Sequence, residues 1–199
     1  MRLIVSGLAC GRVGRILFQG LDFSLEAGNA LTLTGPNGAG KTSLLLILAG
    51  LLEPAAGEVA LEGEAGGEPG SSEDAHLVGH RDGLKTQLSV AENLRFSRSL
   101  FGAPGLDPPA AIERLALAHL LDVPCAYLSA GQRRRVALAR LLVAHRPLWL
   151  LDEPTAALDA ASRLRLADMM RAHLSEGGLI VAATHEPIGI AATEIAIGR

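Results

Sequence analysis

The sequence has little cysteine, few aromatic residues and no long apolar run. Of its 199 residues only 2 are cysteines. Cys10 and Cys125 lie far apart and form no CxxC spacing, so we expect neither a zinc site nor a disulfide framework. A membrane-spanning helix needs roughly 20 apolar residues, whereas the longest apolar run here is the short stretch from Leu44 to Leu52. We therefore expect no membrane-spanning segment, and the N-terminus lacks the pattern of a secretory signal.

Charge is also sparse and nearly balanced. Charged residues make up 20% of the chain and the net charge is −3, which gives no indication of a nucleic-acid-binding surface. Hydrophobic residues make up 49%, enough for a globular chain with a real core. The length fits one domain, or one core with a small subdomain.

Short apolar runs alternate with helical patterns, which predicts an α/β fold around a mainly parallel sheet. The expected strands are Leu3–Leu8, Leu17–Leu25, Ala30–Thr34, Gly57–Glu62, His76–Gly79, Leu148–Leu151, Leu179–Ala183 and Glu194–Ile197. The expected helices are Leu44–Leu52, about 90–121 with interruptions at Ala103-Pro104-Gly105 and Pro108-Pro109, Gln132–His145, and about 160–175. Residues 63–74, rich in Gly, Ser, Glu and Pro, are expected to form a loop.

A glycine-rich stretch between an apolar strand and an apolar helix matches the phosphate-loop pattern G-x-x-x-x-G-K-[ST]. Its glycines let backbone N–H groups turn inward, and the following helix directs its positive end at bound phosphates. A lysine at this place reaches the β- and γ-phosphates, and the next hydroxyl binds Mg²⁺. The predicted nucleotide-binding residues are Gly35, Pro36, Asn37, Gly38, Ala39, Gly40, Lys41, Thr42 and Ser43.

An acidic pair ends a second apolar strand, Leu148-Trp149-Leu150-Leu151. Asp152 would stand at the carboxyl end of that strand, where ligands bind in open α/β sheets, and could hold Mg²⁺ with Thr42. Glu153 could orient or deprotonate the attacking water. The alternative is a plain helix cap.

A second anion-binding pattern follows at Leu128-Ser129-Ala130-Gly131-Gln132, just before a helix. Ser129 and Gly131 place a hydroxyl and bare N–H groups at the helix start. One ATP does not need two phosphate sites far apart in sequence, so we expect Ser129 to meet a γ-phosphate held by a second copy. The alternative is an ordinary serine N-cap.

Together these motifs resemble the ABC ATPase family over essentially the whole chain. The resemblance assigns GPNGAGKT as Walker A, LSAGQ as the signature and LWLLDEP as Walker B. It adds Asp159 of a D-loop, which would link two sites, and the switch histidine His185, which would contact the γ-phosphate. It implies three catalytic residues, Glu153, His185 and Lys41, and two metal ligands, Thr42 and Asp152. It also implies Gln132 as a further nucleotide contact. In the family two copies lie head to tail and enclose two Mg-ATP molecules between them.

The same resemblance implies a P-loop NTPase core with an antiparallel N-terminal β-subdomain. On this basis residues 1–79 and 146–199 form the core, and about 80–145 form a small helical subdomain.

Two positions depart from the family pattern. Arg81 lies about where the family has a glutamine that touches Mg²⁺ and senses a membrane partner. The first hairpin has no aromatic residue to stack on adenine, although Arg12 or Arg15 could stack there instead. We also leave open whether Arg133-Arg134-Arg135 contacts the signature or only forms a solvated face.

Among ABC ATPases the chain is most similar to the ATP-binding subunits of haem exporters in cytochrome c maturation, the CcmA type. The residues that carry this resemblance are GHRDGLKT (79–86), LSVAENL (88–94) and LSAGQRRRVALAR (128–140). It implies integral membrane partners, no nucleic acid, and a peripheral location on the cytoplasmic face of the inner membrane. The alternatives are a soluble regulatory or assembly ATPase of the ABC type, and the ATPase of a different ABC exporter.

Overall fold

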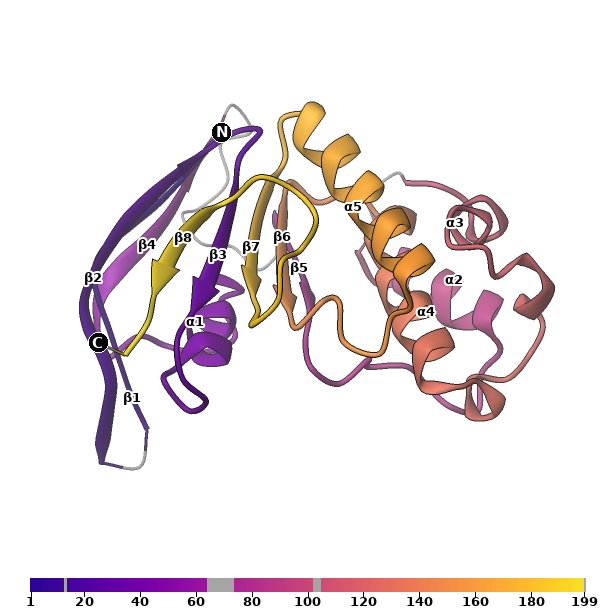
Figure 1. Ribbon diagram of the computed structural model, residues 1–199, viewed down its shortest axis with the longest axis horizontal. Helices are drawn as coiled ribbons and strands as arrows, with labels where there is room; N and C mark the ends of the chain where they lie inside the picture. Colours follow the sequence, from indigo (N-terminus) through magenta and orange to yellow (C-terminus); the bar gives the residue numbers. More distant parts are fainter. Residues whose placement is uncertain (13, 64–73, 102–104, 199) are drawn as a thin grey trace.

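The computed structural model in Figure 1 describes residues 1–12, 14–63, 74–101 and 105–198. Most of the loop expected at 63–74 lies outside these residues, as does part of the expected interruption at Ala103-Pro104-Gly105. The described chain forms two sheets and a group of helices, which confirms the α/β class. None of its described helices is long and apolar enough to cross a membrane.

An antiparallel sheet is built from the N-terminal part of the chain. Its strands, in the order β2-β1-β4, are β2 (Arg15–Glu26), β1 (Arg2–Arg12) and β4 (Ala56–Glu62). Here β1 and β2 extend beyond the predicted Leu3–Leu8 and Leu17–Leu25. A register shift between Val5 and Leu8 changes which face the apolar residues occupy. The hairpin then continues until Arg12 pairs with Arg15, so simple alternation underestimates its length.

The second sheet is parallel throughout, in the order β5-β6-β7-β3-β8. Its strands are β5 (Ala75–Val78), β6 (Leu148–Asp152), β7 (Leu179–Ala183), β3 (Ala30–Thr34) and β8 (Thr193–Ala196). The central strands β6 and β7 are buried along their whole length. This explains why they are continuous apolar runs and not alternating ones.

Successive side chains of β6 enter two different cores. Leu148 and Leu150 pack with α1 (Lys41–Leu48) and the antiparallel sheet. Trp149 and Leu151 pack on the opposite face with α5 (Ala160–Ser175) and the remaining helices. The parallel sheet is therefore covered on both faces, with α1 between the two sheets (Figure 1).

A helical group fills the end of the molecule farthest from the N-terminal sheet (Figure 1). It contains α2 (Val90–Phe101), α3 (Pro108–Arg114), η2 (Ala118–Leu120), η3 (Cys125–Tyr127) and α4 (Ala130–Val143). The predicted helical segment 90–121 is interrupted before Pro108, where residues 105–107 are not helical, and Pro108 and Pro109 themselves begin α3. Asp107 accepts a hydrogen bond from the Ala110 N–H at 2.9 Å and caps the helix, and proline is well suited to the first helical position.

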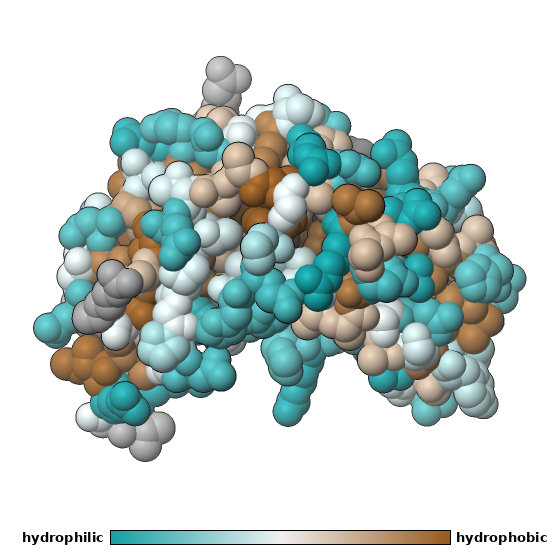
Figure 2. All heavy atoms as spheres, viewed as in Figure 1, coloured by the Kyte–Doolittle hydropathy of each residue, from teal (hydrophilic) through white to brown (hydrophobic). Residues whose placement is uncertain are grey.

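Helix α1 begins and ends earlier than the predicted Leu44–Leu52. It starts at Lys41, inside the phosphate loop, and ends at Leu48. Gly50 then adopts a left-handed φ of 67° and donates its N–H to the Ile47 carbonyl at 2.9 Å, as a glycine after a helix end commonly does. Figure 2 shows that apolar residues lie in small separate patches on one face of the molecule.

Candidate nucleotide site

The phosphate loop lies between β3 and α1. Gly40 caps α1 with a left-handed φ of 110°. A Cβ at Gly40 would also come within 2.9 Å of the Phe18 ring. The position therefore requires glycine for two independent reasons. The result is a helix start whose free N–H groups face the space above the loop.

Lys41 is the first residue of α1 and is only 8% exposed. Its ammonium group donates to the carbonyl oxygens of Gly35 at 2.7 Å and Pro36 at 3.2 Å. The charge is thus held over the loop by the loop's own backbone. A phosphate oxygen entering this space would meet a positive charge that has already lost most of its water.

Thr42 and Asp152 meet although they are far apart in the sequence. Asp152 ends β6 and is 5% exposed, and the Thr42 hydroxyl donates to its Oδ2 at 2.9 Å. A hydroxyl and a carboxylate are oxygen ligands of the kind that Mg²⁺ binds. Among the described residues no cluster of three or more His, Cys, Asp or Glu could hold a metal, so these two oxygens would need phosphate and water to complete a metal site.

Glu153 adopts an unusual backbone conformation, with φ at 46°. A left-handed conformation is unfavourable for a residue with a side chain. Its N–H donates to the Ala183 carbonyl at 2.8 Å, and its own carbonyl accepts from the Ala156 N–H at 3.1 Å. The side chain is thereby directed away from the path of β6, toward His185.

His185 follows β7 and lies above the phosphate loop. Its Nε2 is 3.2 Å from Lys41 Nζ, 3.1 Å from Asn37 Oδ1 and 3.8 Å from Glu153 Oε1. The single ring therefore lies beside residues that come from the phosphate loop and from the end of β6.

These side chains share one open cavity of about 480 Å³. That volume is within the range of small-molecule sites. The cavity is lined by Arg12, Leu17, Asn37, Gly38, Gly40, Lys41, Thr42, Ser43, His80, Asp152, Glu153 and His185. The structure thus brings together the predicted phosphate loop, acidic pair and histidine.

Two lining residues bear on the departures from the family pattern. No Phe, Tyr or Trp is among the described residues that line the cavity, whereas Arg12 is. Arg15 lines a different cavity, beside Gln19 and Ala196. His80, and not Arg81, lines the nucleotide cavity after β5. The sequence left open whether Arg81 takes the glutamine's place, and in the structure the residue of this segment that lines the cavity is His80.

The signature residues lie elsewhere on the same chain. The residues that line the cavity around Lys41 do not include Ser129, Gly131 or Gln132. The Ser129 hydroxyl accepts from the Gln132 N–H at 3.2 Å, and Gln132 Oε1 accepts from the Ser129 N–H at 2.8 Å. This reciprocal capping box fixes the start of α4.

The D-loop packs against the signature. A Cβ on Gly131 would lie 2.8 Å from the carbonyl oxygen of Ala157, so this contact requires glycine. Two residues later the Asp159 carboxylate caps α5 by accepting from the Ser162 N–H at 2.7 Å. That hydrogen bond lowers the pKa of Asp159.

Arg134 is a buried residue whose role the sequence left open. It is 4% exposed and donates to the carbonyl oxygens of Gly79, Asp152 and Glu153. The sequence does place Arg134 on the same face of α4 as the apolar Leu138, which could have indicated a buried charge. It does not show which groups accept hydrogen bonds from that charge.

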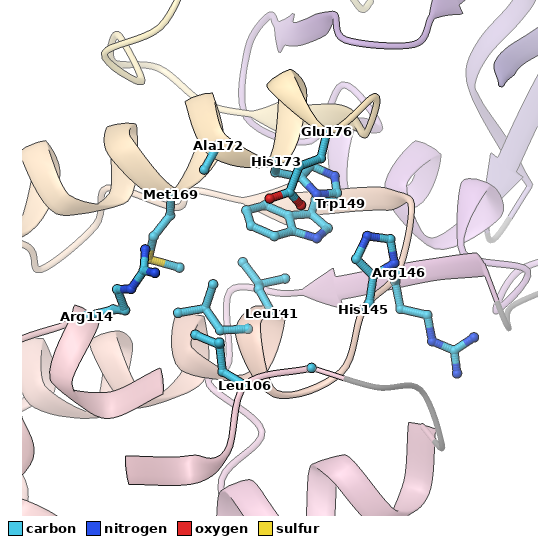
Figure 3. Close-up of a pocket in the computed structure, with 12 residues that line it drawn as sticks. Leu106, Arg114, Leu141, His145, Arg146, Trp149, Met169, Ala172, His173 and Glu176 are labelled. Carbon is cyan, nitrogen blue, oxygen red and sulfur yellow. The ribbon is translucent and has the colours of Figure 1, made fainter. Parts of the chain in front are cut away.

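A separate cavity of about 270 Å³ lies between α5 and the helical group (Figure 3). Its centre is Trp149, whose ring stacks on His173 at 3.9 Å between centroids. Leu106, Leu141 and Met169 form much of its apolar wall. It contains none of the predicted site residues and lies toward the amino ends of the strands, away from the phosphate loop.

A phosphate loop before α1 and an acidic pair on a neighbouring parallel strand define a P-loop nucleoside triphosphatase. Comparison with known proteins narrows this class. The family model described as "ABC transporter" matches residues 18–156. The chain belongs to the ABC transporter family and is its ATP-binding, ATP-hydrolysing component.

Two similar relatives carry the same name. The chain is 57% identical over 194 residues to the cytochrome c biogenesis ATP-binding export protein CcmA of Rhodopseudomonas palustris (strain BisB5), with 96% of each chain covered. It is 53% identical over 200 residues to the protein of that name from Nitrobacter winogradskyi, covering 100% of this chain and 98% of the relative. A bacterial Atm1-family ABC exporter solved with ATP bound has a TM-score of 0.83 at 25% identity, covering 98% of this chain and 36% of that one.

Proposed function

We propose that this chain is the ATPase that powers a membrane complex of cytochrome c maturation, driving haem export or release of a haem chaperone. The proposal is supported by relatives named as cytochrome c biogenesis export proteins that match nearly the full chain. Its partners are a second copy and integral membrane subunits. It works at the cytoplasmic face of the inner membrane as a peripheral subunit.

The division of the predicted site between two places supports a head-to-tail pair. Lys41, Thr42, Glu153 and His185 share one cavity, while Ser129 stands at a helix start outside it. A second copy can bring its Ser129 to the open side of the cavity, so that each ATP is enclosed by two chains. In this arrangement residues 1–79 and 146–199 act as the core, and about 80–145 act as a helical subdomain that carries the signature.

The phosphate loop binds and orients the triphosphate in this proposal. The backbone from Gly35 to Ser43 surrounds the phosphates, and Lys41 neutralises charge on the β- and γ-phosphates. Thr42 and Asp152 hold Mg²⁺, and their oxygens already converge to 2.9 Å. When bound, the ion neutralises charge on the phosphate oxygens.

Glu153 orients the attacking water and accepts its proton. The Glu153 carboxylate and the His185 ring lie on the same side of the loop, 3.8 Å apart. The attacking water would therefore have Glu153 as its proton acceptor on one side. On the other side His185 would contact the γ-phosphate. Asp159 and Gln132 lie at the starts of α5 and α4 and complete the surface offered to the partner copy.

Replacement of Glu153 by Gln tests the catalytic assignment. The amide keeps the shape of the side chain and removes the proton acceptor, so we expect hydrolysis to fall by at least about 100-fold while ATP remains bound. The variant should then accumulate as an ATP-dependent dimer, measured by phosphate release and by light scattering after size-exclusion chromatography. Glu113→Gln, on the exposed side of α3, is the matched control. Normal turnover in Glu153→Gln would remove the assigned role.

Co-purification tests the transporter assignment separately. The Glu153→Gln chain, expressed in its own host and extracted from membranes with ATP present, should carry integral membrane subunits with it. A chain that is active yet never recovers a membrane protein would contradict the proposed complex while leaving the ATPase chemistry intact.

A further inference from the structure

The Arg134 side chain joins three segments that the sequence separates. It extends from the second turn of α4, two residues after the signature, into the interior of the molecule. Its Nη2 donates to the carbonyl oxygens of Asp152 at 2.7 Å and Glu153 at 2.8 Å. Its Nη1 donates to the Gly79 carbonyl at 2.8 Å and lies 3.4 Å from the Asp82 carboxylate.

The contact with Glu153 falls on the strained part of the site. Glu153 has its left-handed φ of 46° at the point where its carbonyl accepts from Arg134. Removing that donor would leave a part-buried carbonyl without one of its partners and would release a backbone conformation that is unfavourable for a residue with a side chain. The direction of the Glu153 carboxylate depends on this backbone.

The contact with Gly79 and Asp82 falls on the segment that follows β5. Arg140, two turns farther along α4, donates to the Asp82 carbonyl at 3.1 Å. Helix α4 therefore holds this segment at two places, and His80 between them lines the nucleotide cavity. The same guanidinium that supports Glu153 thus also fixes a neighbouring wall of the site.

We propose that Arg134 is a positioning residue for hydrolysis, which fixes the backbone of Glu153 relative to the signature helix and to the segment after β5. This inference rests on the proposed role of Glu153 as the residue that activates water. Arg134 is not among the described residues that line the nucleotide cavity, and it acts through Glu153. The planar guanidinium carries its donors on separate nitrogens in a fixed geometry, so it reaches carbonyls of separate segments that a compact ammonium group on a shorter side chain would not reach together.

The position of Arg134 also connects the two nucleotide sites of a head-to-tail pair. Ser129, at the start of α4, faces the ATP of the partner copy, whereas Glu153 serves the ATP of its own chain. Arg134 lies five residues after Ser129 on the same helix. A displacement of α4 when the signature closes on the partner's ATP is therefore transmitted to Glu153 through one side chain.

Arg134→Lys tests the positioning role separately from the charge, because lysine keeps the positive charge but lacks the two Nη groups that donate to the three carbonyls. We expect kcat for ATP hydrolysis to fall about 10- to 100-fold, as misplacement of a catalytic group by about 1 Å commonly causes. We expect KM and the ATP dissociation constant to change by less than about threefold, since the phosphate loop is untouched. Arg134→Gln, which removes the charge as well, should show the same division between kcat and KM.

Two control variants separate positioning from general stability. Arg146→Lys changes an arginine just after α4, whose Nη2 donates to the Phe101 carbonyl at 2.8 Å and not to the site, and this variant should hydrolyse ATP as the parent does. Leu138→Ala weakens the buried face of α4 and should lower the unfolding temperature without lowering kcat well below that temperature.

The outcomes are distinct. The proposal is overturned if Arg134→Lys hydrolyses ATP at the parental kcat, or if it loses ATP binding and stability together with kcat, as Leu138→Ala would near its unfolding temperature. Failure of the parent chain itself to hydrolyse ATP, or normal hydrolysis by Glu153→Gln, would instead remove the proposed function.

Discussion

The hydroxyl of Thr42 donates a hydrogen bond to Oδ2 of Asp152 at 2.9 Å, across 110 positions of sequence. The contact exists because β3 and β6 lie in one parallel sheet, with β7 between them. Their carboxyl ends therefore open on the same edge. It is the geometric basis for placing Mg²⁺ at this edge.

Substitution of either partner should change the magnesium dependence of hydrolysis. In Thr42→Val, which keeps the side-chain shape, we expect the Mg²⁺ concentration for half-maximal activity to rise. In Asp152→Asn we expect kcat to fall about 100-fold or more, because a charged ligand near the transferring phosphate is lost. A magnesium titration of ATPase activity measures both. Thr193→Val, at the exposed start of β8, should behave as the parent, and an unchanged magnesium profile in Thr42→Val would contradict the assignment.

Gly131→Ala tests whether the signature acts on the partner's nucleotide. The added methyl group would come within 2.8 Å of the Ala157 carbonyl and displace the start of α4 from the D-loop. We expect ATP binding to the single chain to be retained, because Gly131 does not line that cavity, while ATP-dependent dimer formation and hydrolysis are reduced. Ala130→Gly is the neighbouring control for a change in helix propensity. Equal loss of ATP binding by the single chain would argue against action in trans.

Arg12→Ala tests how the nucleotide base is held. Arg12 lines the cavity and no Phe, Tyr or Trp does so among the described residues. Stacking of an exposed guanidinium on a ring is worth about 0.5–1 kcal/mol, so we expect the KM for ATP to rise about two- to fivefold with kcat nearly unchanged. Arg15→Ala, on the other side of the hairpin turn, should have no such effect. Steady-state kinetics with ATP and GTP would show whether the loss is specific for the base.

Two buried histidines should make the protein less stable in mild acid. Burial lowers the pKa of His76 and of His173 to about 4, from an ordinary value of 6.5. Each ring is therefore neutral in the folded chain, where its Nε2–H donates to the carbonyl of Ala144 or Pro147. The unfolded chain takes up protons below pH 6.5 and the folded chain does not. Stability is thus complete above pH 6.5 and is lost as the pH falls toward 4.

At pH 5 the loss should be about 2 kcal/mol for each histidine. Urea unfolding at pH 7.5 and pH 5, followed by fluorescence of the one tryptophan, Trp149, measures this difference. His173→Gln keeps a donor for Pro147 and should show a smaller difference between the two pH values. His119→Gln, at an exposed position, should show the parental difference. A parental pH dependence in His173→Gln would contradict the assignment for His173.

Local sequence patterns predicted much of the fold, and particular errors show where they fail. Strands β3 and β7 and helix α5 match their predicted bounds because each is a continuous apolar or amphipathic segment between clear turn signals. The extent of β1 was underestimated because a register shift interrupts its alternation. The sequence placed an interruption at Pro108-Pro109, whereas these prolines begin α3, because Asp107 precedes them and caps the helix.

The sequence alone determined the chemistry of contiguous segments. A phosphate loop needs its glycines, lysine and threonine within eight consecutive residues, so the positions of Lys41 and Thr42 could be read directly. The motifs also paired Asp152 with Thr42, and the structure brings their side chains to 2.9 Å. Only the tertiary structure placed His80 at the cavity and Arg134 on the carbonyl of Glu153. These contacts depend on strand order and on the packing of α4 against the ends of β5 and β6. Such long-range geometry is fixed by the whole chain at once, and no local pattern encodes it.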